Sequence, residues 1–270
     1  MRKNETLFLH FFHKIAVTSR KGLAVKYAAV LVLTALMLAA GPLTVDSSVD
    51  DVLDALDARG KDLKTLSADV KMTNSDPSTG DVADVRKGRL YYRLLPGGDS
   101  QWRVVFDTKI TGRKLEQQKH EWSYSDGKLI DRDYRNHTQA TTQVVKPGEK
   151  MQLFNLEGPF PLPLGQDKAD VHKHFDVKKL PLDKDDPPAT VHLQLTPVAG
   201  TDMARKFKTI DLWVDPKTDM PIRITVLDAD GNSLKQTDLS NVNVTGPVQN
   251  GDFEMEKVDF KAGGWNLTDQ

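Results

Sequence analysis

Residues 122–134 read WSYSDGKLIDRDY, and this stretch decides the fold. Trp122 and Tyr124 alternate with serines, which is the period of a strand with one apolar face. An Asp-Gly pair follows at residues 126–127 and favours a tight turn, because glycine accepts a positive φ. Residues 129–134 then supply a return strand. The stretch therefore predicts a β-hairpin.

The same alternation recurs on both sides of this hairpin. Turn-forming sequences separate the segments, such as Pro-Gly-Gly at residues 96–98 and Asp-Pro-Lys-Thr at residues 215–218. Many short strands with few helices predict a mainly β fold with an α-helical lid, in which a large antiparallel sheet curls into an incomplete barrel. The alternating apolar residues are Ala68, Val70 and Met72; Leu90, Tyr92 and Leu94; Trp102, Val104 and Phe106; Val191, Leu193 and Leu195; Ile210, Leu212 and Val214; Ile222, Ile224 and Val226; and Val258 and Phe260.

Two regions depart from this strand pattern. Apolar residues at helical spacing from 49 to 66 predict an amphipathic helix that Ser47 or Ser48 caps and that Gly60 is expected to break in two. Residues 146–188 are expected to form an insertion over the sheet, with helices near 150–156 and 169–175, an irregular proline-rich segment between them, and a polar tail. No repeat or linker interrupts the rest, so we expect one domain over residues 41–270.

The N-terminus has the charge order of a secretory signal. Residues 1–27 carry six basic side chains and one acidic one, and residues 28–40 are uncharged and mostly apolar. This apolar run is shorter than the roughly 20 residues of a membrane-spanning helix, and it ends in Ala-Ala-Gly. We expect cleavage after Ala40 and a periplasmic protein; an uncleaved inner-membrane anchor is the alternative.

Composition excludes several classes of function. Six of the 37 basic and one of the 38 acidic residues lie within residues 1–40, so the remainder carries a net charge of about −6. Nucleic acid is therefore not an expected partner. The chain has no cysteine, which excludes disulfides, thiolate chemistry and a lipidated cysteine.

The order of the elements resembles the periplasmic outer-membrane lipoprotein carriers, the LolA-like lipoprotein-sorting family, over roughly residues 49–260. The resemblance lies in the order and spacing of four stretches, none of which is a catalytic motif. They are the N-terminal helix leading into Ala68–Met72; Gly88–Arg93; Trp122–Lys128; and Ile210–Pro216 through Met220–Ile224 to Asp230-Gly231.

The resemblance implies a carrier without cofactors that shields acyl chains in an apolar cavity under a helical lid. At about 0.8 kcal/mol per buried CH₂, one long acyl chain contributes roughly 10 kcal/mol. The implied partners are an acylated lipoprotein or lipid, an inner-membrane lipoprotein-release complex and an outer-membrane acceptor, with the carrier as a monomer. The missing cysteine excludes the family's lipid-anchored receptors, and chain length is expected to exclude its two-domain stress sensors.

The expected cavity is lined by the apolar faces of the strands, although a packed sandwich would show the same alternation. The resemblance also makes Arg93 the candidate latch that bonds carbonyls of the lid helix. Phe160, Leu162 and Leu164 are either a mobile apolar gate or a rigid packed loop. The expected lining residues are Leu90, Tyr92, Trp102, Val104, Phe106, Trp122, Tyr124, Ile210, Leu212, Ile222 and Ile224.

No pattern predicts an enzyme or a metal site. His172 and His174 diverge on the expected helix, and no carboxylate is placed beside them or beside His192. Asp126, Asp228 and Asp230 adjoin or lie near turn glycines, where aspartate bonds the local backbone. The chain has no Gly-x-Ser-x-Gly, phosphate-loop or His-Glu-x-x-His motif. The alternative function is a non-enzymatic module of the envelope that binds a protein or senses stress.

Overall fold

A computed structural model describes residues 42–144 and 164–269, all of which lie in one compact unit, Pro42–Gln270. The expected signal sequence, the expected helix at 150–156, and Phe160 and Leu162 of the proline-rich segment lie outside the described residues. Within the described ranges, no helix has the length and apolar character that crossing a bilayer requires.

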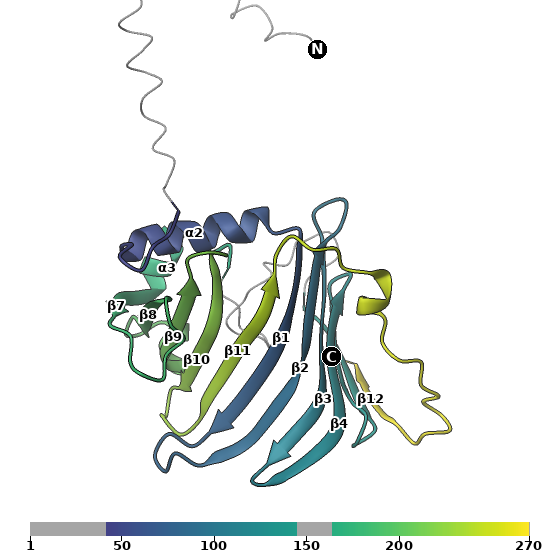
Figure 1. The fold of residues 1–270 in the computed structure, drawn as a ribbon. Helices are drawn as coiled ribbons and strands as arrows, with labels where there is room; N and C mark the ends of the chain where they lie inside the picture. Colours follow the sequence, from purple (N-terminus) through teal and green to yellow (C-terminus); the bar gives the residue numbers. More distant parts are fainter. Residues whose placement is uncertain (1–41, 145–163, 270) are drawn as a thin grey trace, which may run out of the picture. The chain divides into compact units, whose positions relative to one another are not determined.

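Twelve strands form one sheet in the order β12-β6-β5-β4-β3-β2-β1-β11-β10-β9-β8-β7 (Figure 1). All neighbouring strands are antiparallel except β12, which runs parallel to β6. The mainly β fold is therefore confirmed. The strands are β1 Thr65–Ser75, β2 Val82–Leu94, β3 Ser100–Thr111, β4 Lys114–Ser125, β5 Lys128–Asp133, β6 Thr138–Gln143, β7 Phe175–Leu180, β8 Val191–Pro197, β9 Phe207–Asp215, β10 Met220–Asp228, β11 Leu234–Asn243 and β12 Asn266–Asp269.

The hairpin expected at residues 122–134 is present as β4 and β5. Asp126 and Gly127 have φ values of 52° and 73°, so both turn residues adopt the left-handed conformation that an Asp-Gly hairpin uses. Tyr124 lies opposite Leu129 across the turn, and Trp122 lies opposite Asp131.

Helix α2, Val49–Asp62, begins as expected and does not break. Ser48 Oγ accepts a hydrogen bond from the Asp51 N–H, and Asp51 Oδ2 accepts one from the Ser48 N–H, which together form a capping box. The prediction that Gly60 interrupts the helix is wrong. This glycine lies within α2, where its missing side chain lets the backbone of Gly165 come close to the helix. A Cβ at Gly60 would lie 2.2 Å from the backbone nitrogen of Gly165, whose N–H donates to the carbonyl of Leu56 over 3.1 Å.

The described part of the insertion contains both an expected and an unexpected element. Helix α3, Lys168–His174, is present within a residue of its expected bounds. No strand was expected in the polar tail that follows, but its first part is strand β7 at the edge of the sheet, paired with β8. The remaining short helices are α4, Asp202–Lys206, and the 3-10 helix η1, Asn250–Phe253.

Strands β6, β11 and β12 were missed, and the strand expected around residues 258–260 is absent from the described structure. The sequence of β6 is TQATTQ, which offers no apolar face to a search for alternation. Phe260 lies in a turn, where its ring packs against Trp265 at a centroid distance of 5.6 Å. The apolar character of Phe260 therefore serves a ring contact within a turn and not the face of a strand.

The sheet has two different faces, and its core lies on one of them. The inner face carries Val70, Val104, Leu193 and Leu212, which belong to the same buried cluster as the apolar side of α2. In Figure 1, α2 crosses the ends of strands β7 to β10. The outer face, opposite, is mostly polar.

Candidate functional site

Ten of the eleven expected lining residues lie in the buried cluster on the inner face. On one side they form cross-strand rows, in which Tyr92, Trp102 and Tyr124 are neighbours on β2, β3 and β4. On the other side, Leu212 of β9 lies opposite Ile224 of β10. The alternation thus identified which side chains share a face; that they line a ligand cavity stays a prediction.

Several of these side chains pack directly against one another. The rings of Trp102 and Tyr124 stack with centroids 6.0 Å apart, and Phe106 meets the edge of Trp122 at 5.3 Å. Tyr124 has no exposed surface and Tyr92 only 2%. Aromatic packing of this kind stabilises the face by itself, beyond the burial of its area.

Ile222 is the residue that the structure places elsewhere. The pairing of β9 with β10 shifts register between Pro221 and Arg223, so Ile222 falls at an irregularity in the strand. Its side chain lines a groove of about 870 Å³ that also involves Arg223, Asp238 and the loop at residues 185–188. This groove is lined by charges of both signs, among them Lys71, Lys87, Arg89, Asp69, Asp107 and Asp186.

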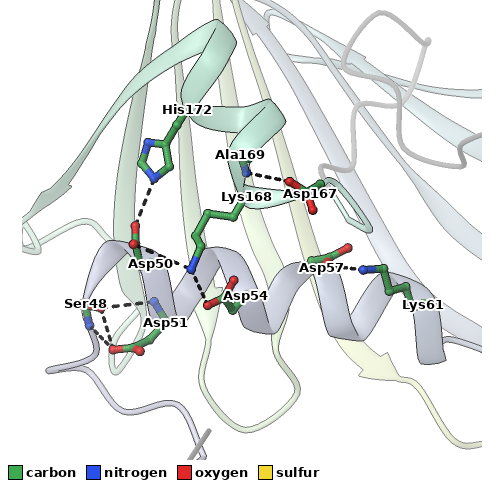
Figure 2. Close-up of polar contacts among 10 residues, drawn as sticks. All are labelled: Ser48, Asp50, Asp51, Asp54, Asp57, Lys61, Asp167, Lys168, Ala169 and His172. Atoms are coloured by element: carbon green, nitrogen blue, oxygen red, sulfur yellow. Dashed lines mark hydrogen bonds and ion pairs between the residues drawn. The ribbon is translucent and has the colours of Figure 1, made fainter.

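Helix α3 is tied to α2 by ion pairs, which Figure 2 shows. Lys168 Nζ lies 2.7 Å from Asp54 Oδ2 and 3.8 Å from Asp50 Oδ2, and His172 Nε2 lies 3.1 Å from Asp50 Oδ1. The bond to Asp54 raises the pKa of Lys168. These contacts are exposed, so they orient the two helices and contribute little stability.

Arg93 has partners other than those expected of a lid latch. Its guanidinium donates to Gln101 Oε1 over 2.9 and 2.7 Å and to Asn250 Oδ1 over 2.6 Å, and it stands 4.3 Å above the ring of Phe253. Among its hydrogen bonds within residues 42–144 and 164–269, none goes to a carbonyl of α2 or α3. In this structure Arg93 joins the sheet to η1.

A polar network that the sequence did not reveal lies beyond the apolar rows on the inner face. Arg86 NH1 lies 2.7 Å from His120 Nδ1, and His120 Nε2 lies 2.6 Å from Asp131 Oδ1. Because a guanidinium only donates, Nδ1 accepts and Nε2 carries the proton that is donated to Asp131. Burial favours the neutral carboxyl of Asp131, but the hydrogen bond from His120 and the positive charge of Arg86 outweigh this effect, so the pKa of Asp131 is lowered.

His174 and Asp228 have local partners, and His192 pairs with a residue of the neighbouring strand. His174 Nδ1 lies 2.8 Å from the carbonyl of Asp170, and His192 Nε2 lies 2.9 Å from Asp211 Oδ1 while its ring stacks on Trp213 at 4.2 Å. Asp228 Oδ1 accepts from the Asn232 N–H within its turn. The described residues contain no group of three or more His, Asp or Glu side chains placed to hold a metal ion.

Burial of Tyr92 makes a testable prediction about alkaline stability. Burial raises the pKa of the Tyr92 phenol to about 12, against about 10 in an unfolded chain. The folded protein therefore holds the phenol proton more tightly than the unfolded chain does. This contribution to the free energy of unfolding is complete below pH 10 and is lost, by up to about 3 kcal/mol, as the pH rises toward 12. Urea unfolding at pH 8, 10 and 11 should show a steeper loss for the parent chain than for Tyr92→Phe. Parallel pH profiles of the two chains would contradict this.

Comparison with known proteins adds a partial family match. Residues 137–257, just under half of the chain, match the model described as the MucB/RseB N-terminal domain. In the structure this range runs from the start of β6 to just beyond η1. The comparison with curated proteins returned no match. The exclusion of two-domain stress sensors by chain length stays a prediction; the matched model is itself described as an N-terminal domain.

Solved structures were also compared with the chain. A crystal structure of MucB is 13% identical with a TM-score of 0.47, covering 78% of this chain and 64% of that one. The MucA/MucB complex of Pseudomonas aeruginosa gives 14% identity and a TM-score of 0.45, covering 76% and 60%. A LolA superfamily protein from Nitrosomonas europaea gives 10% and 0.32, covering 77% and 98%. This chain therefore spans less than two thirds of the MucB chains.

Proposed function

We propose that this chain is a non-enzymatic module of the bacterial envelope that binds a protein partner, in the manner of a stress sensor. The observation that carries the proposal is the match of residues 137–257 to the MucB/RseB N-terminal domain. The charge order of residues 1–40, which favours export, agrees with a periplasmic location.

The kind of partner is also a proposal. MucB is described in solved complexes with MucA and with MucA(peri). For this chain we infer a partner of the same general class, a polypeptide segment exposed in the periplasm.

Acyl carriage is the second candidate, and it is supported by the position of Tyr92, Trp102 and Tyr124 on one buried face. The same side chains pack against one another, which is what a filled core requires. The comparisons give no support to transport of lipoproteins in particular. Protein binding is therefore the stronger proposal.

Native mass spectrometry of the full chain, purified gently from a bacterial periplasm, tests both functions at once. We expect a stoichiometric complex with a polypeptide, which should form again from separately purified components with a micromolar or lower Kd. A chain that carries acyl species, displaces a fluorescent fatty acid and retains no polypeptide would overturn the proposal in favour of carriage.

Matched variants separate the two outcomes. Trp102→Arg and Phe106→Glu alter the inner face, whereas Val198→Glu alters a side chain that is already 41% exposed. For variants that remain folded, polypeptide binding should be unchanged in all three. An effect of the first two on fatty-acid displacement alone would mark the inner face as a separate lipid site.

A further inference from the structure

The C-terminal strap, residues 249–265, contacts side chains on the outer face of strands β2 to β5. After β11 the chain crosses to this face, forms η1 and ends in β12 (Figure 1). Phe253 is 5% exposed; its ring lies 6.5 Å from that of Tyr91 and 4.3 Å below the guanidinium of Arg93. This phenylalanine is the first anchor of the strap.

Two buried arginines of the sheet hold the strap by its backbone. Arg103 NH1 donates to the carbonyl of Asp252 over 3.1 Å, and Arg132 NH1 donates to the carbonyl of Glu256 over 2.8 Å. Residues 254–259 form no helix or strand. A sheet surface that binds an extended segment through backbone groups and a few anchors resembles a peptide-binding site.

A second aromatic anchor lies further along the strap. The guanidinium of Arg132 stands 5.3 Å from the ring of Phe260, and Trp265 stacks on His137 at 5.2 Å. Residues 266–269 then add to the edge of β6 as a short parallel strand. Strand addition at an open edge is a common mode of peptide recognition.

The charges of the two partners are complementary. The charged side chains of the sheet that bind the strap are four cations, Arg93, Arg103, Lys119 and Arg132. The buried Glu121 pairs with Arg103 and Lys119 within the sheet. Residues 249–259 of the strap carry four acidic groups, Asp252, Glu254, Glu256 and Asp259, and one lysine. Lys119 Nζ lies 2.8 Å from Glu256 Oε2, and this bond lowers the pKa of Glu256.

The contacts of the strap are those of an exchangeable ligand. Most of its bonds to the sheet come from side chains of the sheet, and strand pairing begins only after the strap, in the four described residues of β12. All four residues of β12 are exposed. A competing segment that supplies the same carbonyls and two aromatic anchors would replace these contacts one for one.

We propose that the outer face of β2 to β6 is a docking site for an extended, acidic segment of a partner protein that carries two aromatic anchors. The strap occupies this site within the free chain and leaves it when the partner binds. The inference rests on the proposed function as a protein-binding module and names the surface and the chemistry of the partner.

The probe that tests this is a fluorescein-labelled peptide with the strap sequence, QNGDFEMEKVDFKAGGW. Full-length chain carrying Phe253→Ser and Phe260→Ser has a weakened strap and should bind the peptide at least tenfold more tightly than the parent chain, as measured by fluorescence anisotropy. Adding Arg132→Gln should reduce that affinity at least tenfold. Arg205→Gln, at an exposed residue of α4, is the matched control and should leave the affinity for the peptide unchanged.

A second measurement needs no variant of the chain. The same peptide with a photoreactive benzoylphenylalanine at the Phe253 position should crosslink to β2 of the parent chain, near Tyr91 and Arg93. The proposal would be overturned if the folded strap-weakened chain does not bind the peptide, or if Arg132→Gln leaves the affinity unchanged. Crosslinks to residues outside β2 would overturn it as well. A dimer that forms by exchange of straps would assign the surface to a second copy and overturn it as well.

Failure of this inference can be told apart from failure of the proposed function. If the polypeptide complex of the parent chain persists with Arg132→Gln and with excess strap peptide, the docking surface is wrong and the protein-binding function stands. If the parent chain forms no polypeptide complex, the proposed function itself fails.

Discussion

Replacing Glu121 with alanine is expected to lower the free energy of unfolding by about 3–5 kcal/mol. Glu121 has no exposed surface, and its carboxylate lies 3.0 Å from Arg103 NH2 and 2.8 Å from Lys119 Nζ. Arg103 is only 8% exposed, so removal of the carboxylate leaves a buried guanidinium without its main partner. The penalty comes from this orphaned charge.

Urea unfolding of Glu121→Ala, compared with the double variant Glu121→Leu and Arg103→Met, measures this effect. The double variant removes both charges and should recover much of the loss, because a buried pair replaced by apolar side chains is often tolerated. Asp202→Ala breaks an ion pair with Arg205 in which both side chains are about 70% exposed, and should cost less than about 1 kcal/mol. A loss for Glu121→Ala no larger than for this control would refute the prediction.

Gly88→Ala is expected to destabilise the sheet by about 3 kcal/mol or more, at the upper end of overpacking effects. A Cβ at this position would lie 1.8 Å from the carbonyl oxygen of Val105 and 2.7 Å from the Cα of Phe106. Both atoms belong to the backbone of β3, next to a register shift between Lys87 and Gly88. No side-chain movement relieves the contact, so β2 and β3 must separate locally.

The measurement for Gly88→Ala is the denaturation midpoint together with hydrogen exchange of the β2 and β3 amides. Exchange should accelerate around residues 86–90 and 104–108 before it does elsewhere. Gly251→Ala is the control, since a Cβ there meets no heavy atom within 4 Å, and its stability should stay within about 0.5 kcal/mol of the parent chain. A parent-like midpoint for Gly88→Ala would contradict the proposed clash.

Alternation of apolar residues predicted the strands that bury one full face. β3, β8 and β9 carry such residues at every second position and were found from them alone. β6 and β12 were missed because they are held by their position at the sheet edge and by pairing with distant residues, not by burial of an apolar stripe. Helix α2 was found from its cap and stripe, but the purpose of Gly60 depends on Gly165, over 100 residues away.

The candidate site, too, could be predicted only in part from the sequence. The period of two placed Leu90, Tyr92 and Trp102 on the inner face, yet it cannot distinguish a lined cavity from a packed core. The outer face was less predictable, because Arg103 and Arg132 look like ordinary solvated charges until the strap that buries them is known. Residues brought together by non-local contacts leave little local signal.

The position of β1 in the sheet has a consequence for the order of folding. β1 pairs with β2 along the chain and with β11 on its other side, from Ser67 opposite Asn243 to Ser75 opposite Leu234. The meander from β1 to β6 therefore assembles from local contacts, while one edge of β1 stays open until the chain has emerged as far as residue 243. Pairing of β1 with β11 is a long-range step, so it should be slow and should set the time during which a newly synthesised chain is open to aggregation or proteolysis.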